Sequence, residues 1–112
     1  MPIADTTVTI ASGQSLSTGS VSIAGATGLW MRMPANWGGG DLTFQLATDG
    51  VNFFNLFLAN GKEYTAKIVP GTVVPFDMSV AKGGGALKIR SGTSVRPVVQ
   101  GANRDFICSV LT

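Results

Sequence analysis

Residues 42–58 read Leu-Thr-Phe-Gln-Leu-Ala-Thr-Asp-Gly-Val-Asn-Phe-Phe-Asn-Leu-Phe-Leu, and this stretch decides the fold class. Its first residues alternate between apolar and polar, with Leu42, Phe44 and Leu46 on one face, as in a β-strand that buries one side. Asp49-Gly50 then separates this segment from a second apolar run, residues 53–58. An Asp-Gly pair between two such runs is a strong local indication of a β-hairpin, so the stretch predicts two antiparallel strands.

The same pattern recurs along the chain at short spacing, with Gly, Pro or Asn between the segments. A second turn at Asn60-Gly61 extends the hairpin to a predicted three-stranded meander over residues 41–69. Pro70 and Pro75 bracket a short segment that we expect at a sheet edge. The alternating apolar residues of the remaining predicted strands are Val8 and Ile10; Val21 and Ile23; Leu29, Met31 and Met33; Tyr64, Ala66 and Ile68; Leu87 and Ile89; and Phe106, Cys108 and Val110.

No segment of useful length shows helical periodicity, although Asp77 to Lys82 fits one helical turn capped by Asp77. Short strands at this spacing are typical of sandwiches and barrels. We therefore predict that residues 1–112 form one all-β domain, an antiparallel β-sandwich of jelly-roll type with eight or nine short strands.

The composition argues against most kinds of catalytic and metal-binding site. The chain has no His, one Cys and only 12% charged residues, about half the usual share. Its six carboxylates stand mostly at strand ends and turns, so we predict no enzyme activity, no cofactor and no metal site. The basic residues of the last third are spread too thinly for nucleic acid. With no basic leader at the N-terminus and no long apolar window, we expect no signal peptide, no membrane contact and synthesis in a cytosol.

What remains is a binding function, and two tryptophans are the leading candidates. Trp30 and Arg32 alternate with Leu29, Met31 and Met33, so they project outward if the methionine side faces the core; a flipped register is the alternative. Trp37, in a Gly-rich loop, either stacks on a partner or sugar or covers one end of the core. We favour the covering role.

The whole-chain pattern adds a resemblance. It rests on Met-Pro-Ile-Ala-Asp-Thr-Thr-Val-Thr-Ile (1–10), Met-Pro-Ala-Asn-Trp (33–37), Ile-Arg-Ser-Gly-Thr-Ser (89–94) and Pro-Val-Val-Gln-Gly-Ala (97–102). This pattern resembles small structural proteins encoded among the head genes of tailed bacteriophages. The resemblance implies a virion component on the capsid surface, made in the bacterial host cytoplasm. It would be a cement or decoration protein that binds the major capsid protein and itself, as a homodimer or homotrimer.

Besides the tryptophans and Arg32, we expect contacts from Thr6, Thr7, Val8 and Ile10, because a terminal segment can add to a neighbouring sheet edge. Two other functions stay open. Residues 42–53 also resemble the strand-turn-strand of discoidin-like jelly rolls and carbohydrate-binding modules, which implies a glycan- or receptor-binding module of a phage tail or fibre. A cellular β-sandwich interaction domain is the third.

Overall fold

The computed structural model describes residues 3–112, and its regular structure is almost entirely β-strand. Eight strands and one short 3-10 helix, η1 (Met78–Val80), follow one another along the chain. The strands are β1 (Ile3–Ile10), β2 (Val21–Ser22), β3 (Gly28–Arg32), β4 (Leu42–Ala47), β5 (Phe54–Asn55), β6 (Val73–Phe76), β7 (Ala86–Ser91) and β8 (Arg104–Leu111). Met1 and Pro2, the first residues of the phage-like motif, lie outside the described residues.

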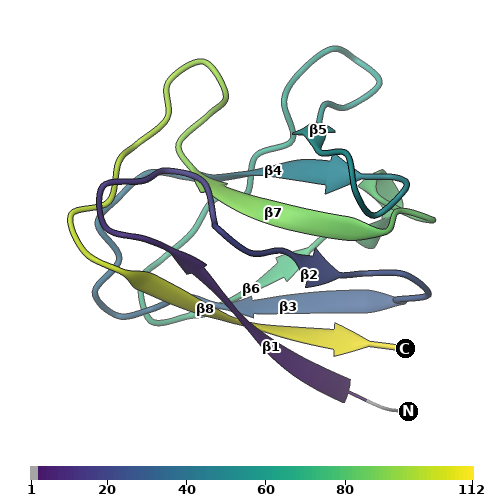
Figure 1. The fold of residues 1–112 in the computed structure, drawn as a ribbon, viewed down its shortest axis with the longest axis horizontal. Helices are drawn as coiled ribbons and strands as arrows, with labels where there is room; N and C mark the ends of the chain where they lie inside the picture. Colours follow the sequence, from purple (N-terminus) through teal and green to yellow (C-terminus); the bar gives the residue numbers. More distant parts are fainter. Residues whose placement is uncertain (1–2) are drawn as a thin grey trace.

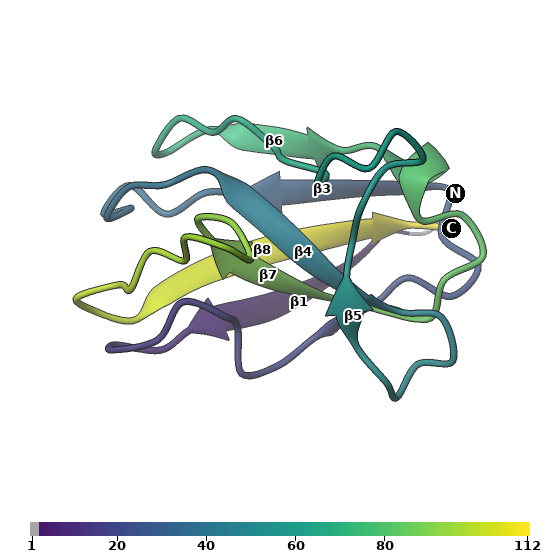
Figure 2. The ribbon, with the colours of Figure 1, turned by 90° about the horizontal axis from the view of Figure 1, so that it is seen from above.

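The strands form two antiparallel four-stranded sheets, in the orders β1-β8-β3-β6 and β2-β7-β4-β5. Figure 1 shows β4 and β7 of one sheet above β3 and β8 of the other, and Figure 2 shows β1 and β6 at opposite edges of the first sheet. The predicted all-β sandwich is therefore confirmed, with eight strands. The first four strands alternate between the two sheets, and the finer jelly-roll assignment stays a prediction.

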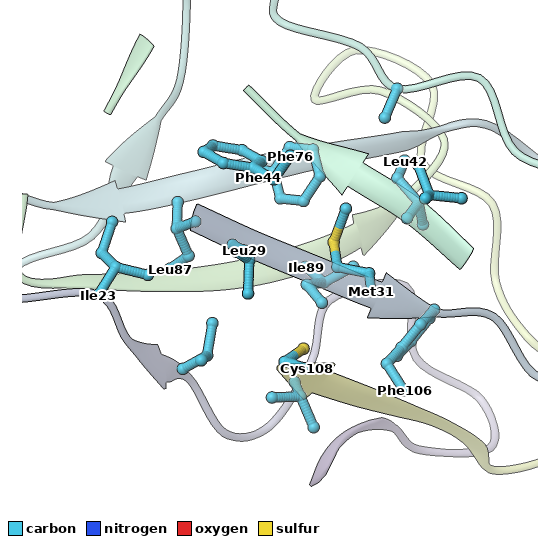
Figure 3. Packing of buried hydrophobic residues seen from close by; sticks show 14 of the residues in the cluster. Ile23, Leu29, Met31, Leu42, Phe44, Phe76, Leu87, Ile89, Phe106 and Cys108 are labelled. Carbon is cyan, nitrogen blue, oxygen red and sulfur yellow. The ribbon is translucent and has the colours of Figure 1, made fainter. Parts of the chain in front are cut away.

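The core lies between the sheets and is built from the alternating residues of both. Leu29 and Met31 of β3 and Phe106 and Cys108 of β8 point inward from the first sheet, opposite Leu87 and other apolar residues of the second (Figure 3). All five are 3% exposed or less. Because side chains alternate across a strand, burying these residues turns their sequence neighbours outward.

Strand β8 organises the first sheet because it pairs with both β1 and β3. All eight residues of β1 are in register with β8, from Ile3 opposite Leu111 to Ile10 opposite Arg104. The last strand therefore returns beside the first, and the two described ends of the chain lie at the same end of the sandwich (Figure 1).

The central hairpin is confirmed, but its second strand is shorter than predicted. Strands β4 and β5 pair at Leu46 with Phe54 and at Gln45 with Asn55, and not along the whole of residues 53–58. The connection bends at Gly50, whose φ of 80° is readily adopted only by glycine. Asp49 holds the bend, because its carboxylate accepts hydrogen bonds from the backbone N–H groups of the two residues that follow Gly50, each at 2.8 Å.

The predicted third strand of the meander is wrong, since residues 60–69 make only isolated bridges. One of these joins Ala66 to Leu42 through two backbone hydrogen bonds. Tyr64 instead closes the side of the sandwich, packing its ring against Phe44 and Phe76 at centroid distances of 5.7 and 5.2 Å. Aromatic packing between the two sheets thus takes the place of strand pairing in this segment.

Candidate binding surface

One exposed sheet face carries three of the candidate contact residues, Thr7, Trp30 and Arg32. It is the outer side of the sheet β1-β8-β3-β6, and we call it the Trp30 face. Its residues follow from alternation with the buried set, and they are Ile3, Asp5, Thr7, Thr9, Gly28, Trp30, Arg32, Val73, Pro75, Asp105, Ile107, Ser109 and Leu111. Of the two orientations that the sequence left open, the structure shows the one in which Trp30 and Arg32 point outward, and it excludes the flipped register.

Register places Trp30 near the middle of this face. Across the sheet it stands between Ser109 on β8 and Pro75 on β6. Its side chain is half exposed, at 49%, and two exposed aliphatic residues, Ile3 (65%) and Val73 (51%), lie on the flanking edge strands. The face therefore combines a large aromatic ring with aliphatic neighbours on a continuous four-stranded surface.

Polar side chains around Trp30 are held in place by one another. The Asp5 carboxylate accepts a hydrogen bond from the Ser109 hydroxyl at 2.6 Å and from the Arg32 guanidinium at 3.2 Å. Both partners of the Asp5–Arg32 pair are about half exposed, so this ion pair contributes little to stability. Its effect is to fix the direction of Arg32 beside Trp30 before any partner arrives.

The strand-addition candidates divide between the two sides of β1. Thr7 lies on the Trp30 face, whereas Thr6 lies on the inner side of the strand but remains exposed. Val8 (1% exposed) and Ile10 (0%) belong to the core, so the expectation that their side chains contact a partner is corrected. The segment is also no loose terminus, because every residue of β1 is paired with β8.

Trp37 is buried, so the expectation that it contacts a partner is also corrected. It is 8% exposed, its ring packs edge-on against Phe106 at 5.4 Å, and its Nε1–H donates to the carbonyl oxygen of Gly40 at 3.0 Å. The covering role that the sequence favoured is confirmed. Buried Gln100 fixes the same loop, accepting a hydrogen bond from the Gly38 N–H at its Oε1 and donating from its Nε2 to the Gly39 carbonyl.

A second exposed surface was missed at the level of sequence. We call it the phenylalanine patch, formed by Phe53, Asn55 and Phe57 on the outer side of the other sheet. Phe57 is 48% exposed. The Lys88 ammonium lies over the Phe53 ring, 4.8 Å from the ring centroid. Phe54, on the opposite side of the strand, is 72% exposed. In residues 53–58, apolar side chains occupy both faces of the predicted strand, so an edge strand there has to expose some of them. This pattern was the signal in the sequence for an exposed aromatic patch.

Beside the phenylalanine patch lies a buried ion pair that alternation alone does not reveal. Arg90 falls on the same side of β7 as Lys88, yet it is only 7% exposed. Its guanidinium meets the Glu63 carboxylate at 3.3 Å and donates to the Asn55 side-chain oxygen at 2.7 Å. Glu63 also accepts from the backbone N–H of Ser94. Arg90 and Glu63 together connect the segments around residues 55, 63 and 94, which cover the outer side of this sheet.

Ionisable groups elsewhere have structural roles. Hydrogen bonds from the backbone N–H groups of Asn52 and Val51 lower the pKa of Asp49 to about 2. The pKa of Asp77 is also lowered, by hydrogen bonds from the hydroxyl and the backbone N–H of Ser79. Asp77 caps the start of η1, and Ser79 lies within it. Burial raises the pKa of the Cys108 thiol to about 12, which keeps it as an unreactive thiol at neutral pH.

Nothing in residues 3–112 assembles three or more acidic, Cys or His side chains as a metal site would need. The same part of the chain holds no helix of the length and apolarity that crossing a membrane requires. A shallow hollow of about 280 Å³ lies between the β2–β3 connection and η1, lined by Ala26, Thr27, Met78, Ser79 and Lys82. With Lys82 as its only charged group, this hollow offers little to orient a ligand.

Comparisons with models of protein families, with curated proteins and with solved structures find no match to this chain.

Proposed function

We propose that this protein is a non-enzymatic virion subunit of a tailed bacteriophage, a cement or decoration protein that binds the shell of major capsid protein. The observation that carries the proposal is the Trp30 face. It presents a half-exposed Trp30, an Arg32 oriented by Asp5, and exposed aliphatic edges on one rigid sheet. The resemblance of residues 1–10, 33–37, 89–94 and 97–102 to phage head proteins supplies the choice of partner.

Two physical arguments support a protein partner for this face. Trp and Arg are the side chains that most often dominate binding energy at protein interfaces. Side chains already fixed by hydrogen bonds lose less conformational entropy on binding, and Arg32 is fixed in this way. Many copies on one shell, and self-association as a dimer or trimer, would multiply a modest single contact without requiring any cofactor.

The test is binding of purified protein to capsid shells of the phage that encodes it. We expect Trp30→Ala to weaken binding about 30-fold or more, the effect of losing an interface residue that contributes about 2 kcal/mol. Phe57→Ala is the matched control, since Phe57 is similarly exposed but follows β5, an edge strand of the other sheet. Wild-type affinity in Trp30→Ala, with the thermal unfolding midpoint unchanged, would remove the Trp30 face from the proposal.

The phenylalanine patch favours a second function, a glycan- or receptor-binding module of a phage tail or fibre. Phe53 and Phe57 flank Asn55, and the side-chain amide of Gln45 donates to the Asn55 oxygen at 3.2 Å. Aromatic rings beside planar amides are the combination that stacks on and hydrogen-bonds to sugars. Binding of host surface polysaccharide that Phe57→Ala abolishes and Trp30→Ala retains would favour this function.

A further inference from the structure

The four sheet edges of the sandwich are unequally protected against pairing with another chain. β2 and β5 are two residues long, and β6 carries Pro75 within its four residues. Short edge strands and proline are two devices by which proteins prevent edge-to-edge association. β1 has neither, and it runs for eight residues without a lysine, an arginine or a break in register. Its one charged residue, Asp5, is already paired with Arg32 and Ser109. β1 is therefore the least protected edge among the described strands.

The direction of the free backbone groups on β1 follows from one loop contact. The backbone N–H of Thr18 donates to the carbonyl oxygen of Thr9 at 3.1 Å, from the side of β1 away from β8. Because a residue in an antiparallel strand points its N–H and C=O to the same side and its neighbours point theirs to the other, Thr7 and Asp5 also face away from β8. Within residues 3–112, no backbone group pairs with them on that side.

We propose that β1 of a second copy adds to this edge in an antiparallel direction. The twofold axis passes between the two Thr6 residues, so that Asp5 of each copy stands opposite Thr7 of the other. Each of these two residue pairs can exchange both of its backbone hydrogen bonds, about four bonds in total. The two sheets β1-β8-β3-β6 then become one continuous eight-stranded sheet.

Two features select the register: the charge of Asp5 and the Thr9 carbonyl, which already accepts a hydrogen bond. A shift toward the N-terminus sets Asp5 directly opposite Asp5 of the second copy, and like charges in that position destabilise a strand pair. A shift toward the C-terminus requires the carbonyl of Thr9, which already accepts from Thr18. The intermediate register separates the two Asp5 residues and makes its four bonds from Asp5 and Thr7 alone, so the pairing ends before Thr9. It also brings the two exposed Thr6 side chains together, a favourable cross-strand pair.

The second copy fits this edge because the strand complements itself in that register. Rotation about an axis perpendicular to the sheet also places both Trp30 faces on the same side of the dimer, which doubles the contact with a common partner. The dimer specifies the self-association in the proposed function. It is tested without capsids, so the dimer and the capsid contact can fail independently.

The first test is the mass of the protein in solution by sedimentation equilibrium, for wild type and for Thr7→Pro. Proline at position 7 removes an N–H that faces the free edge but keeps the Thr6 and Val8 hydrogen bonds to β8. We expect a wild-type dimer and a Thr7→Pro monomer with an unchanged circular dichroism spectrum. Thr7→Val, which keeps the backbone donor, should remain a dimer.

Disulfide trapping tests the register and remains informative if Thr7→Pro fails to fold. The variants are made in a Cys108→Ala background, because Cys108 lies opposite Thr6 on β8 and would otherwise compete. In the proposed register, Thr6→Cys places two thiols opposite each other in a pair with Cα atoms about 4.5 Å apart, within disulfide range. We expect covalent dimers from Thr6→Cys and none from Thr7→Cys.

Three results would overturn the proposal: a wild-type protein that is monomeric throughout, a Thr7→Pro variant that stays dimeric, or covalent dimers from Thr7→Cys and not Thr6→Cys. A monomeric wild type whose binding to capsid shells is lost in Thr7→Pro would assign the edge to a strand of the capsid protein instead. Concentration-dependent dimers that depend on position 7, with Thr6→Cys linked, would establish the twofold pairing.

Discussion

Exchanging the two tryptophans for alanine separates the effect of a buried indole from that of an exposed one. Trp37→Ala removes an indole that is 8% exposed, its edge-on contact with Phe106 and its hydrogen bond to Gly40. Loss of a buried Trp costs about 3–5 kcal/mol. Trp30 is 49% exposed, and Trp30→Ala should cost about 1 kcal/mol or less. For a domain of this size, Trp37→Ala should lower the unfolding midpoint by more than about 10 °C.

The assay is thermal and urea unfolding of both variants beside wild type, with Trp37→Phe as the control. The smaller aromatic ring of Trp37→Phe would keep most of the packing but would lose the indole N–H donor. We therefore expect this control to lose less stability than Trp37→Ala. A Trp37→Ala variant within about 1 kcal/mol of wild type would refute the argument. The indole would then not be supporting the end of the core.

Three further predictions concern charges and the thiol. Arg90→Met leaves Glu63 buried without its partner and should cost about 3–5 kcal/mol in urea unfolding, whereas adding Glu63→Gln should recover part of the loss. The pKa of Asp49 in the folded protein is about 2, below its ordinary value of 3.8. Its contribution to stability is therefore complete above pH 3.8 and is lost as the pH falls through 2. NMR titration should give a midpoint near 2, and a midpoint near 3.8 would contradict the turn contacts. Cys108 should react with thiol reagents at about pH 8 only as fast as the protein opens, so labelling as fast as that of a free thiol would refute its burial.

The strands that bury one face could be predicted from sequence because alternation reports burial directly. In β3 and β8, every apolar residue assigned to the core is buried. For Trp30 and Arg32, alternation left two registers open, and burial of Leu29 and Met31 selects the outward one. The edge position of β6 also followed from the sequence, because proline cannot supply the hydrogen bonds of a central strand.

Alternation was less informative where loops cover the outer side of a sheet. Thr43 and Arg90 read as outward residues of β4 and β7, but residues from the segments 55–63 and 92–94 cover them. Their burial depends on contacts far apart in sequence, such as the Thr43 hydroxyl donating to the Gly92 carbonyl at 2.7 Å. Sequence pattern within one strand holds no information about such contacts.

Residues 60–69 show the opposite error, a local pattern without a strand. Tyr64, Ala66 and Ile68 alternate correctly, and the side chains of all three are at least partly buried against the core. They bridge the gap between β4 and β6 without continuous pairing, because the Tyr64 ring reaches Phe44 of one sheet and Phe76 of the other. Periodic burial therefore predicted which residues face inward, and only the assignment of a strand was wrong.

If this chain coats a phage head, as we propose, its number of copies in purified particles should show it. Quantitative mass spectrometry of particles from the producing system would give the ratio of this chain to the major capsid protein. We expect a ratio close to that of the shell subunits. A few copies per particle would move the chain to a vertex or tail, and absence from the particle would contradict the virion assignment altogether.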